Sequence, residues 1–259
     1  MLCIVVDVWG VTELHNVIYV VGGWSSTIHR FSSTTHQRLS DIKVRYFTQP
    51  WDIVACQQTS QLYIADQKSI WRLSADDEDI KLLLPKSPSD AFEPWKLSMT
   101  STRLLVTTRD SHQLTQFDAD GNELRRVQLP DDMEPFHAVE SPNGIFVISH
   151  SNTQLKQWTI SEVNTNGEVL CQFIGSDLLS LGFTEHIAVD SRGNVIVADF
   201  SNGRILLLDN RLSLRRVILN ETQLSYKEPR RLCYMEQSGQ LLVGLDLIGQ
   251  VAVFDMLHH

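Results

Sequence analysis

Short apolar segments alternate with polar turns along the whole chain, and groups of four such segments begin with the same signal. In this signal a Pro, or a residue in its place, and then a bulky residue precede the first apolar segment. The six copies are Val8-Trp9-Gly10, Pro50-Trp51-Asp52, Pro94-Trp95-Lys96, Pro135-Phe136-His137, Glu185-His186-Ile187 and Pro229-Arg230-Arg231. Taken at positions 9, 51, 95, 136, 186 and 230, the bulky residues are 42, 44, 41, 50 and 44 residues apart. A repeat of this length predicts the blades of a β-propeller.

Each repeat continues with three further segments of strand character. A turn such as 141–144 or 190–194 comes first, where Gly or Asn permits the positive φ of a tight hairpin. In the fifth repeat the remaining strands are expected at 195–198, 204–208 and 214–219. Four short strands joined by turns are typical of one propeller blade.

The two ends of the chain are expected to meet in the last blade. The sixth repeat has room for only three strands, and the apolar run 2–6 is a strand without a blade. Pairing of 2–6 with 250–254 closes the ring and removes the open sheet edges. The sequence therefore predicts an all-β fold, a six-bladed β-propeller of four-stranded antiparallel blades in a single domain. The approximate blade boundaries are 9–46, 47–90, 91–131, 132–178, 179–224, and 225–259 together with 1–8.

One repeat carries the motif of a known family. The stretch 183–205, with Asp190-Ser191-Arg192-Gly193-Asn194 at its turn, closely resembles the NHL repeat, and 62–66 is similar to its strand and Asp. The resemblance implies the propeller fold over essentially the whole chain, with degenerate repeats in blades one, three, four and six. NHL domains of tripartite-motif proteins bind RNA or protein, and the propeller of an amidating lyase holds zinc. The positions that match its zinc-binding His are Pro135 and Glu185 here, so neither a metal nor another cofactor is expected.

Charge and composition narrow the classes of partner. The 31 acidic residues outnumber the 22 Lys and Arg, and the net charge of −9 argues against a nucleic-acid surface. No apolar run is long enough to span a membrane, and no basic residue precedes the run 2–6 as in a signal peptide. The four cysteines form no CxxC pair, and a cytoplasmic monomer is the expectation.

The topology of a blade predicts which loops share a face. Successive turns of a four-stranded meander alternate between two sheet edges, so the loops between blades lie beside the loops between strands two and three. Aromatic and Arg side chains on such a face favour recognition. The candidate partner-binding residues are Trp9, Trp51, Trp95, Phe136, His186, Arg230, Trp24, Arg109, His150 and Phe200. The alternative is that the bulky residues at equivalent positions pack between the blades.

The sequence contains no GxSxG, P-loop or HExxH motif. The main expectation is therefore a non-catalytic scaffold that binds a protein or a peptide. The first alternative is single-stranded RNA binding on the same face, through the aromatic residues with Arg230, Arg109 and Lys68. The second is a metal-dependent enzyme similar to lactonases or lyases, with a site assembled across blades that the sequence cannot display.

Overall fold

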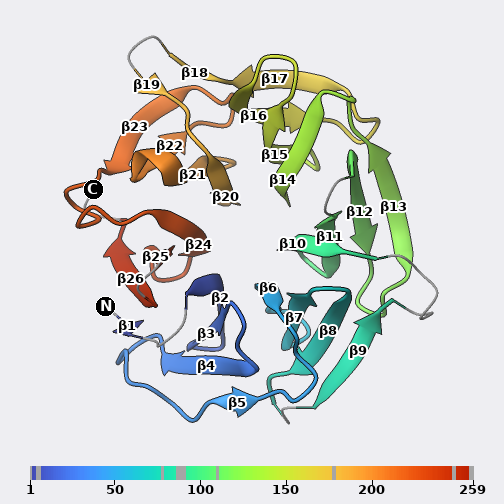
Figure 1. Cartoon of the computed structure of the whole chain (residues 1–259), viewed down its shortest axis with the longest axis vertical. Coiled ribbons are helices and arrows are strands. Elements are labelled where there is room, and N and C mark those ends of the chain that lie inside the picture. Colours follow the sequence, from blue (N-terminus) through green and yellow to red (C-terminus); the bar gives the residue numbers. More distant parts are fainter. Residues whose placement is uncertain are drawn as a thin grey trace.

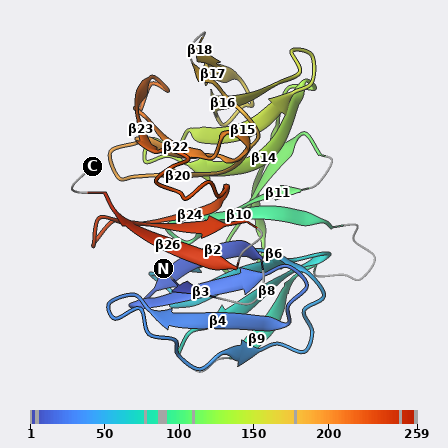
Figure 2. The same ribbon diagram turned by 60° about the vertical axis from the view of Figure 1, so that its left-hand side comes forward.

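Six four-stranded antiparallel sheets stand around a central axis, as the sequence predicts (Figure 1). The computed structural model describes residues 2–3, 7–76, 79–85, 92–108, 111–176, 179–246 and 249–256. In five sheets the strands follow one another in chain order, with the first strand nearest the axis, and the side view shows the sheets stacked like blades (Figure 2). No helix among the described residues has the length and apolar character needed to cross a membrane.

The strands of each blade follow the expected segments closely. Blade one holds β2 (Val8–Leu14), β3 (Val17–Gly22), β4 (Thr27–Ser32) and β5 (Ile42–Lys43). Blade two holds β6 (Pro50–Cys56), β7 (Gln61–Asp66), β8 (Ser69–Ser74) and β9 (Ile80–Leu84). Blade three holds β10 (Pro94–Thr100), β11 (Arg103–Thr108), β12 (Gln113–Phe117) and β13 (Glu123–Gln128). Blade four holds β14 (Met133–Glu140), β15 (Phe146–Asn152), β16 (Gln157–Val163) and β17 (Val169–Phe173).

Blade five holds β20 (Thr184–Val189), β21 (Val195–Asp199), β22 (Arg204–Leu208) and β23 (Leu214–Leu219). Blade six holds β24 (Pro229–Met235), β25 (Gln240–Leu245), β26 (Gln250–Asp255) and β1 (Leu2–Cys3). The longer fourth repeat contains a two-stranded hairpin of β18 (Gly175–Ser176) and β19 (Leu179–Ser180). The helical element that the structure describes is the short 3-10 turn η1 (Phe200–Asn202).

The predicted closure of the ring is confirmed. β1 pairs antiparallel with β26, with Leu2 opposite Val251 and Cys3 opposite Gln250. Leu2 is buried in an apolar cluster with Val8 of blade one and Leu242 of blade six. The N-terminal strand therefore links the first and last blades, and it lies beside β26 in Figure 1.

We expect Leu2→Ala to lower the free energy of unfolding by about 2–3 kcal/mol, because it leaves a cavity at the closing seam. The measurement is chemical denaturation followed by tryptophan fluorescence. Leu124→Ala is the control, because Leu124 is exposed on β13 and its loss should change stability by less than about 0.5 kcal/mol. Equal stabilities of the two variants would show that the seam contributes little to closure.

Apolar side chains hold the ring together between the blades. The described residues form six buried clusters, and each cluster joins two neighbouring blades. Between blades one and two, for example, Val21 and Ile28 belong to one buried cluster with Ile53 and Ile64. Burial of both faces of each sheet explains why the second strands of the blades have nearly continuous apolar segments, such as 195–198 in β21. One edge of each inner strand is left facing the axis.

A β-bulge interrupts every inner strand at the same place. It lies between Val8 and Gly10 in blade one and between Pro50 and Asp52 in blade two. The other four inner strands have the bulge at the equivalent position. The residues on the bulge are Trp9, Trp51, Trp95, Phe136, Glu185 and Arg230, and the residues directly after it are Gly10, Asp52, Lys96, His137, His186 and Arg231.

This register corrects the sequence alignment of blade five. His186 was expected at the bulky position, but Glu185 occupies that place and His186 is the counterpart of Asp52. The shift arises because Thr184 stands where most other blades have the marker Pro, so the sequence signal does not fix the position of the bulge. In blade one the post-bulge residue is Gly10, since a Cβ there would come within 2.7 Å of the backbone nitrogen of Ile53.

Candidate functional site

The bulge residues of the first four blades form a chain of touching aromatic rings. Trp9 stacks on Trp51 with the ring centroids 4.5 Å apart, and Trp51 lies 4.7 Å from Trp95. Trp95 meets Phe136 edge to face at 5.7 Å. All four rings stay half-buried. They therefore pack against one another, as expected from the alternative in which the bulky residues pack between the blades. Part of each ring also stays exposed.

Blades four, five and six complete the circle. Phe136 meets Phe183 at 4.8 Å, and Phe183 meets Phe200 at 5.6 Å. The Cζ atom of Arg230 lies 5.4 Å from the ring centre of Phe200 and 5.7 Å from that of Trp9, within the range of cation–π contacts. We call this circle the aromatic collar: Trp9, Trp51, Trp95, Phe136, Phe183, Phe200 and Arg230. Phe183 was not among the predicted residues.

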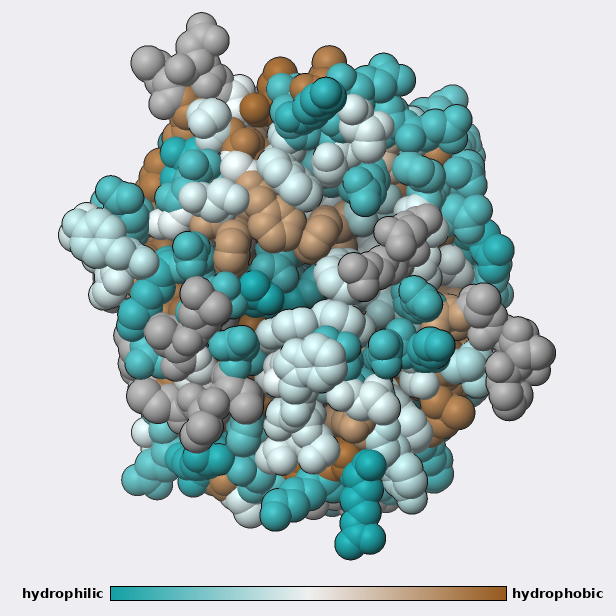
Figure 3. Space-filling view, viewed as in Figure 1, coloured by the Kyte–Doolittle hydropathy of each residue, from teal (hydrophilic) through white to brown (hydrophobic). Residues whose placement is uncertain are grey.

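A layer of buried polar side chains lies next to the collar. It consists of the post-bulge residues with the bulge residue Glu185, and we call it the polar layer: Asp52, Lys96, His137, His186, Arg231 and Glu185. Every member is buried. The face viewed in Figure 3 shows the same arrangement, because hydrophobic and near-neutral atoms border a hollow at its centre that has hydrophilic atoms inside.

The polar layer cross-links the free edges of the inner strands. Asp52 accepts hydrogen bonds at 3.0 Å from the backbone N–H of its neighbour Ile53 and of Leu97 in the next blade. Arg231 donates to the carbonyl oxygens of Trp9 in blade one and Trp51 in blade two. Backbone groups that have no strand partner are satisfied in this way, which a buried sheet edge requires.

His137 also joins three blades through its two ring nitrogens. The N–H of Ile187 donates to Nδ1 at 3.2 Å, so the ring proton is on Nε2, which donates to the carbonyl oxygen of Leu97 at 3.2 Å. Burial lowers the pKa of His137, in keeping with this neutral form. His186 stacks on it at 3.9 Å, and burial lowers the pKa of His186 well below its ordinary value.

Three members of the polar layer approach the arrangement of a metal site. Asp52, His137 and His186 each offer a donor atom, and these atoms lie within 4.8 Å of one another. However, both ring nitrogens of His137 already bind the backbone. A metal ion would have to break one of these hydrogen bonds, so the donor set does not fit a metal.

Glu185 is the acidic group at the centre of the layer. Its Oε1 lies 2.7 Å from Nη1 of Arg231 and 3.7 Å from Nζ of Lys96. Its Oε2 lies 3.4 Å from Nε of Arg230 but accepts no hydrogen bond from the described residues. The residue is only 4% exposed. Burial raises the pKa of Glu185 to about 8, against the opposing charge of Arg230.

The charges of the six groups at Glu185 balance when every group is ionised. Lys96, Arg230 and Arg231 face the carboxylates of Asp52, Glu185 and Asp246, the last of which lies 2.9 Å from Nε of Arg230. Burial lowers the pKa of Arg231 to about 10, so its guanidinium keeps its charge at neutral pH. Protonation of Glu185 therefore leaves a net positive charge beside the collar.

The other predicted partner-binding residues differ from one another in their exposure to solvent. Trp24 is 77% exposed and adopts a positive φ of 61° in the turn between β3 and β4. His150 is fully buried within blade four, where its Nε2 bonds to the hydroxyl of Ser161 at 2.7 Å. Its expected contact with a partner at the surface is therefore wrong, because β15 extends to Asn152 and carries His150 inside the sheet. Arg109 lies outside the described residues.

Comparison with known proteins adds the fold neighbours. No family model and no curated protein matches the sequence. A structure of streptogramin B lyase has a TM-score of 0.66 at 11% identity and covers 97% of this chain and 96% of that chain. A virginiamycin B lyase from Staphylococcus aureus with quinupristin has a TM-score of 0.68 at 12% identity, and the match covers 95% of this chain and 79% of that chain. Hydrazine synthase of Kuenenia stuttgartiensis has a TM-score of 0.67 at 14% identity, and the match covers 95% of this chain and 82% of that chain.

These neighbours correct the functional expectation. The sequence favours a non-catalytic scaffold for a protein or a peptide and argues against an enzyme, whereas propellers of the same architecture are enzymes by name. The expectation failed because it rested on the absence of short catalytic motifs. In a propeller the polar groups of a site come from different blades, as Lys96, Glu185 and Arg231 do here. At such low identity the likeness itself shows only the six-bladed fold.

Proposed function

We propose that the protein is a carbon–oxygen lyase whose active site is the polar layer beside the aromatic collar. The observation that carries this proposal is Glu185, a buried carboxyl group with one oxygen free of hydrogen bonds from the described residues and three cations around it. A carboxyl group in this setting can exchange a proton with a bound substrate. Its pKa near neutrality supports that role, because acid–base groups are most effective near the working pH.

In the proposed reaction, the ionised carboxylate of Glu185 takes a proton from a substrate carbon. The electron pair of the broken C–H bond forms a carbon–carbon double bond, and the adjacent C–O bond breaks so that the oxygen leaves with its electron pair. Once Glu185 is protonated, Arg230 and Arg231 have lost a neighbouring negative charge. Their positive charges then stabilise the leaving oxygen, as in other sites arranged for a developing anion.

The aromatic collar supplies the binding surface for the rest of the substrate. Its half-buried Trp and Phe rings offer apolar area that loses little conformational entropy on binding. A substrate seated on these rings also keeps water from the polar layer, which strengthens the electrostatic interactions there. The expected substrate is an ester or a lactone that has an apolar or aromatic part beside the reacting bond.

We also infer that the blades are of the NHL type. The segment 183–205 supports this assignment, since its turn Asp190-Ser191-Arg192-Gly193-Asn194 and the strands on either side of it are similar to the NHL repeat. That the protein is a cytoplasmic monomer stays a prediction from the sequence.

Cyclic esters are the probes that test the proposed activity, and quinupristin is included because it is the compound in the structure of the lyase from Staphylococcus aureus. We expect the ring of at least one cyclic ester to open without a change in mass, which liquid chromatography with mass spectrometry detects as an isomer. Hydrolysis would instead add the mass of one water. An added water, or the absence of any product across the panel, would contradict a lyase.

A further inference from the structure

The axis of the propeller contains a cavity on the far side of the polar layer from the collar. Its volume is 270 Å³, and the inner strands of all six blades line it. One lining residue from each blade, in chain order, is Val11, Ile53, Leu97, His137, Ile187 and Leu232. Glu185 and the aromatic rings of the collar do not line it. We call this cavity the axial channel.

Two buried polar atoms of residues in the channel wall have no hydrogen-bond partner among the described residues. They are Nδ1 of His186 and Oγ of Ser98, and each residue is only 8% exposed. Native proteins leave few buried polar atoms unpaired, and an exception needs an explanation. A molecule bound in the channel would satisfy the ring nitrogen of His186.

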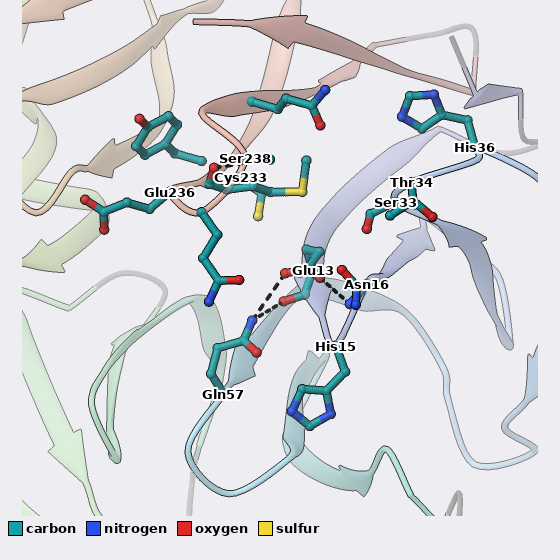
Figure 4. A pocket seen from close by; sticks show the side chains of 14 residues that line it. Glu13, His15, Asn16, Ser33, Thr34, His36, Gln57, Cys233, Glu236 and Ser238 are labelled. Atoms are coloured by element: carbon teal, nitrogen blue, oxygen red, sulfur yellow. Dashed lines mark hydrogen bonds between the residues drawn. The ribbon is translucent and has the colours of Figure 1, made fainter. Parts of the chain in front are cut away.

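The channel can be reached without passing the collar. It shares Glu13, Gln57, Cys233 and Tyr234 with a larger pocket of 890 Å³ between blades six and one. Figure 4 shows this pocket, where the side chain of Gln57 points toward Glu13. Nε2 of Gln57 donates to the carbonyl oxygen of Glu13 at 3.0 Å and to its Oε2 at 3.3 Å. This pocket forms an entrance from the opposite face of the ring.

The groups around the channel disfavour a charged occupant. Among the described residues no Lys or Arg lines it, so an anion would find no counter-charge in the channel wall. At the inner end, Lys96 and Arg231 of the polar layer are already paired with the carboxylates of Glu185 and Asp52, so this end offers no free charge to an ion of either sign. Toward the outer end, Glu140 is already bound to Arg103 and Gln116, both at 2.8 Å. An unpaired charge in such a place carries a large desolvation penalty.

We propose that the axial channel is a second binding site, for a small uncharged molecule whose hydroxyl group donates a hydrogen bond to Nδ1 of His186. The low pKa of His186 supports this, because a neutral ring has a nitrogen that can accept. The aliphatic side chains of Ile53, Leu97 and Leu232 suit the apolar part of such a molecule. The site shares His137 and His186 with the polar layer but does not contain Glu185, and binding there can be measured without turnover, so the proposal does not depend on the proposed lyase activity.

Phenol is the probe that tests this proposal, with ¹⁵N-histidine-labelled protein observed by NMR. We expect phenol to shift the ring resonances of His186 and to saturate with a Kd of about 1 mM, as befits a molecule of its size. Toluene, which lacks the hydroxyl, should bind at least about fivefold more weakly, since a hydrogen bond contributes about 1 kcal/mol. Benzoate and benzylammonium should leave these resonances unchanged.

Two variants locate the bound probe. Ala188→Leu adds bulk to the channel wall and should abolish the effect of phenol on His186, whereas His150→Phe changes a buried histidine that is not among the channel-lining residues and should not alter it. Unchanged His186 resonances in the wild type would show that the channel holds only water. Equal binding to wild type and Ala188→Leu would place phenol elsewhere. Either result overturns the proposal.

Discussion

Glu185→Gln should lower kcat/KM for the elimination by about a thousandfold, which is within the range that an acid–base residue contributes. Glutamine has nearly the same shape and keeps an oxygen for the hydrogen bond from Arg231, but it cannot take up the proton. Steady-state kinetics on the cyclic ester that gives an isomeric product provide the measurement. Glu140→Gln is the matched control, because Glu140 is equally buried but hydrogen-bonded to Arg103 and Gln116 away from the collar, and its activity should stay within about twofold.

The pH dependence separates a proton-transfer role from a structural one. The base is the ionised form of Glu185, and its pKa is about 8, so kcat/KM of the wild type should rise about tenfold per pH unit below pH 8 and level off above it. Glu185→Gln should lose this rise. A variant that keeps the wild-type profile at a lower rate would show that Glu185 only maintains the site, and the proposed mechanism would then fail.

Arg231→Ala should lower the free energy of unfolding by about 3–5 kcal/mol, which is the usual effect of removing one partner from a buried ion pair. Arg231 is only 1% exposed and contacts both Glu185 and Asp52. Without its guanidinium these carboxylates lie buried with less compensation, and the carbonyl oxygens of Trp9 and Trp51 lose a donor. Equilibrium unfolding in urea measures the change.

Two further variants make this result interpretable. Arg216→Ala removes an exposed guanidinium from β23 and should change stability by less than about 0.5 kcal/mol. Arg231→Met keeps most of the buried volume, so its loss of stability reports the missing charge and hydrogen bonds apart from the cavity. A loss below about 1 kcal/mol for Arg231→Ala would show that the polar layer does not hold the inner edges together.

The fold could be predicted because its signals are local and repeated. A Pro with a bulky residue, a turn rich in Gly or Asn, and short apolar strands recur at a nearly constant spacing. Even the closing strand followed from counting, since the last repeat lacked one strand and the run 2–6 had no blade. The pairing of Leu2 with Val251 bears this out.

The site could be predicted only in part, because it depends on bulges and on contacts between blades. The collar residues Trp51 and Trp95 stood out as repeated bulky positions. The sequence also held a signal for the polar layer, since Asp52, Lys96 and Arg231 each follow a bulky residue directly. That signal can be interpreted only when the position of the bulge is known, because the bulge places both the bulky residue and the residue after it at the axis. The contact of Arg231 with Trp9 joins residues 222 positions apart, which no local pattern reveals.

The pairing of β1 with β26 also determines the order of events during synthesis. β1 leaves the ribosome first, and its partner β26 follows almost a whole chain length later. At typical translation rates this delay is roughly 10 to 50 seconds. During that time the blades can form one after another, but β1 has no partner strand and the ring stays open beside blade one. A nascent chain of this protein therefore depends on staying unaggregated until its last strand has been made.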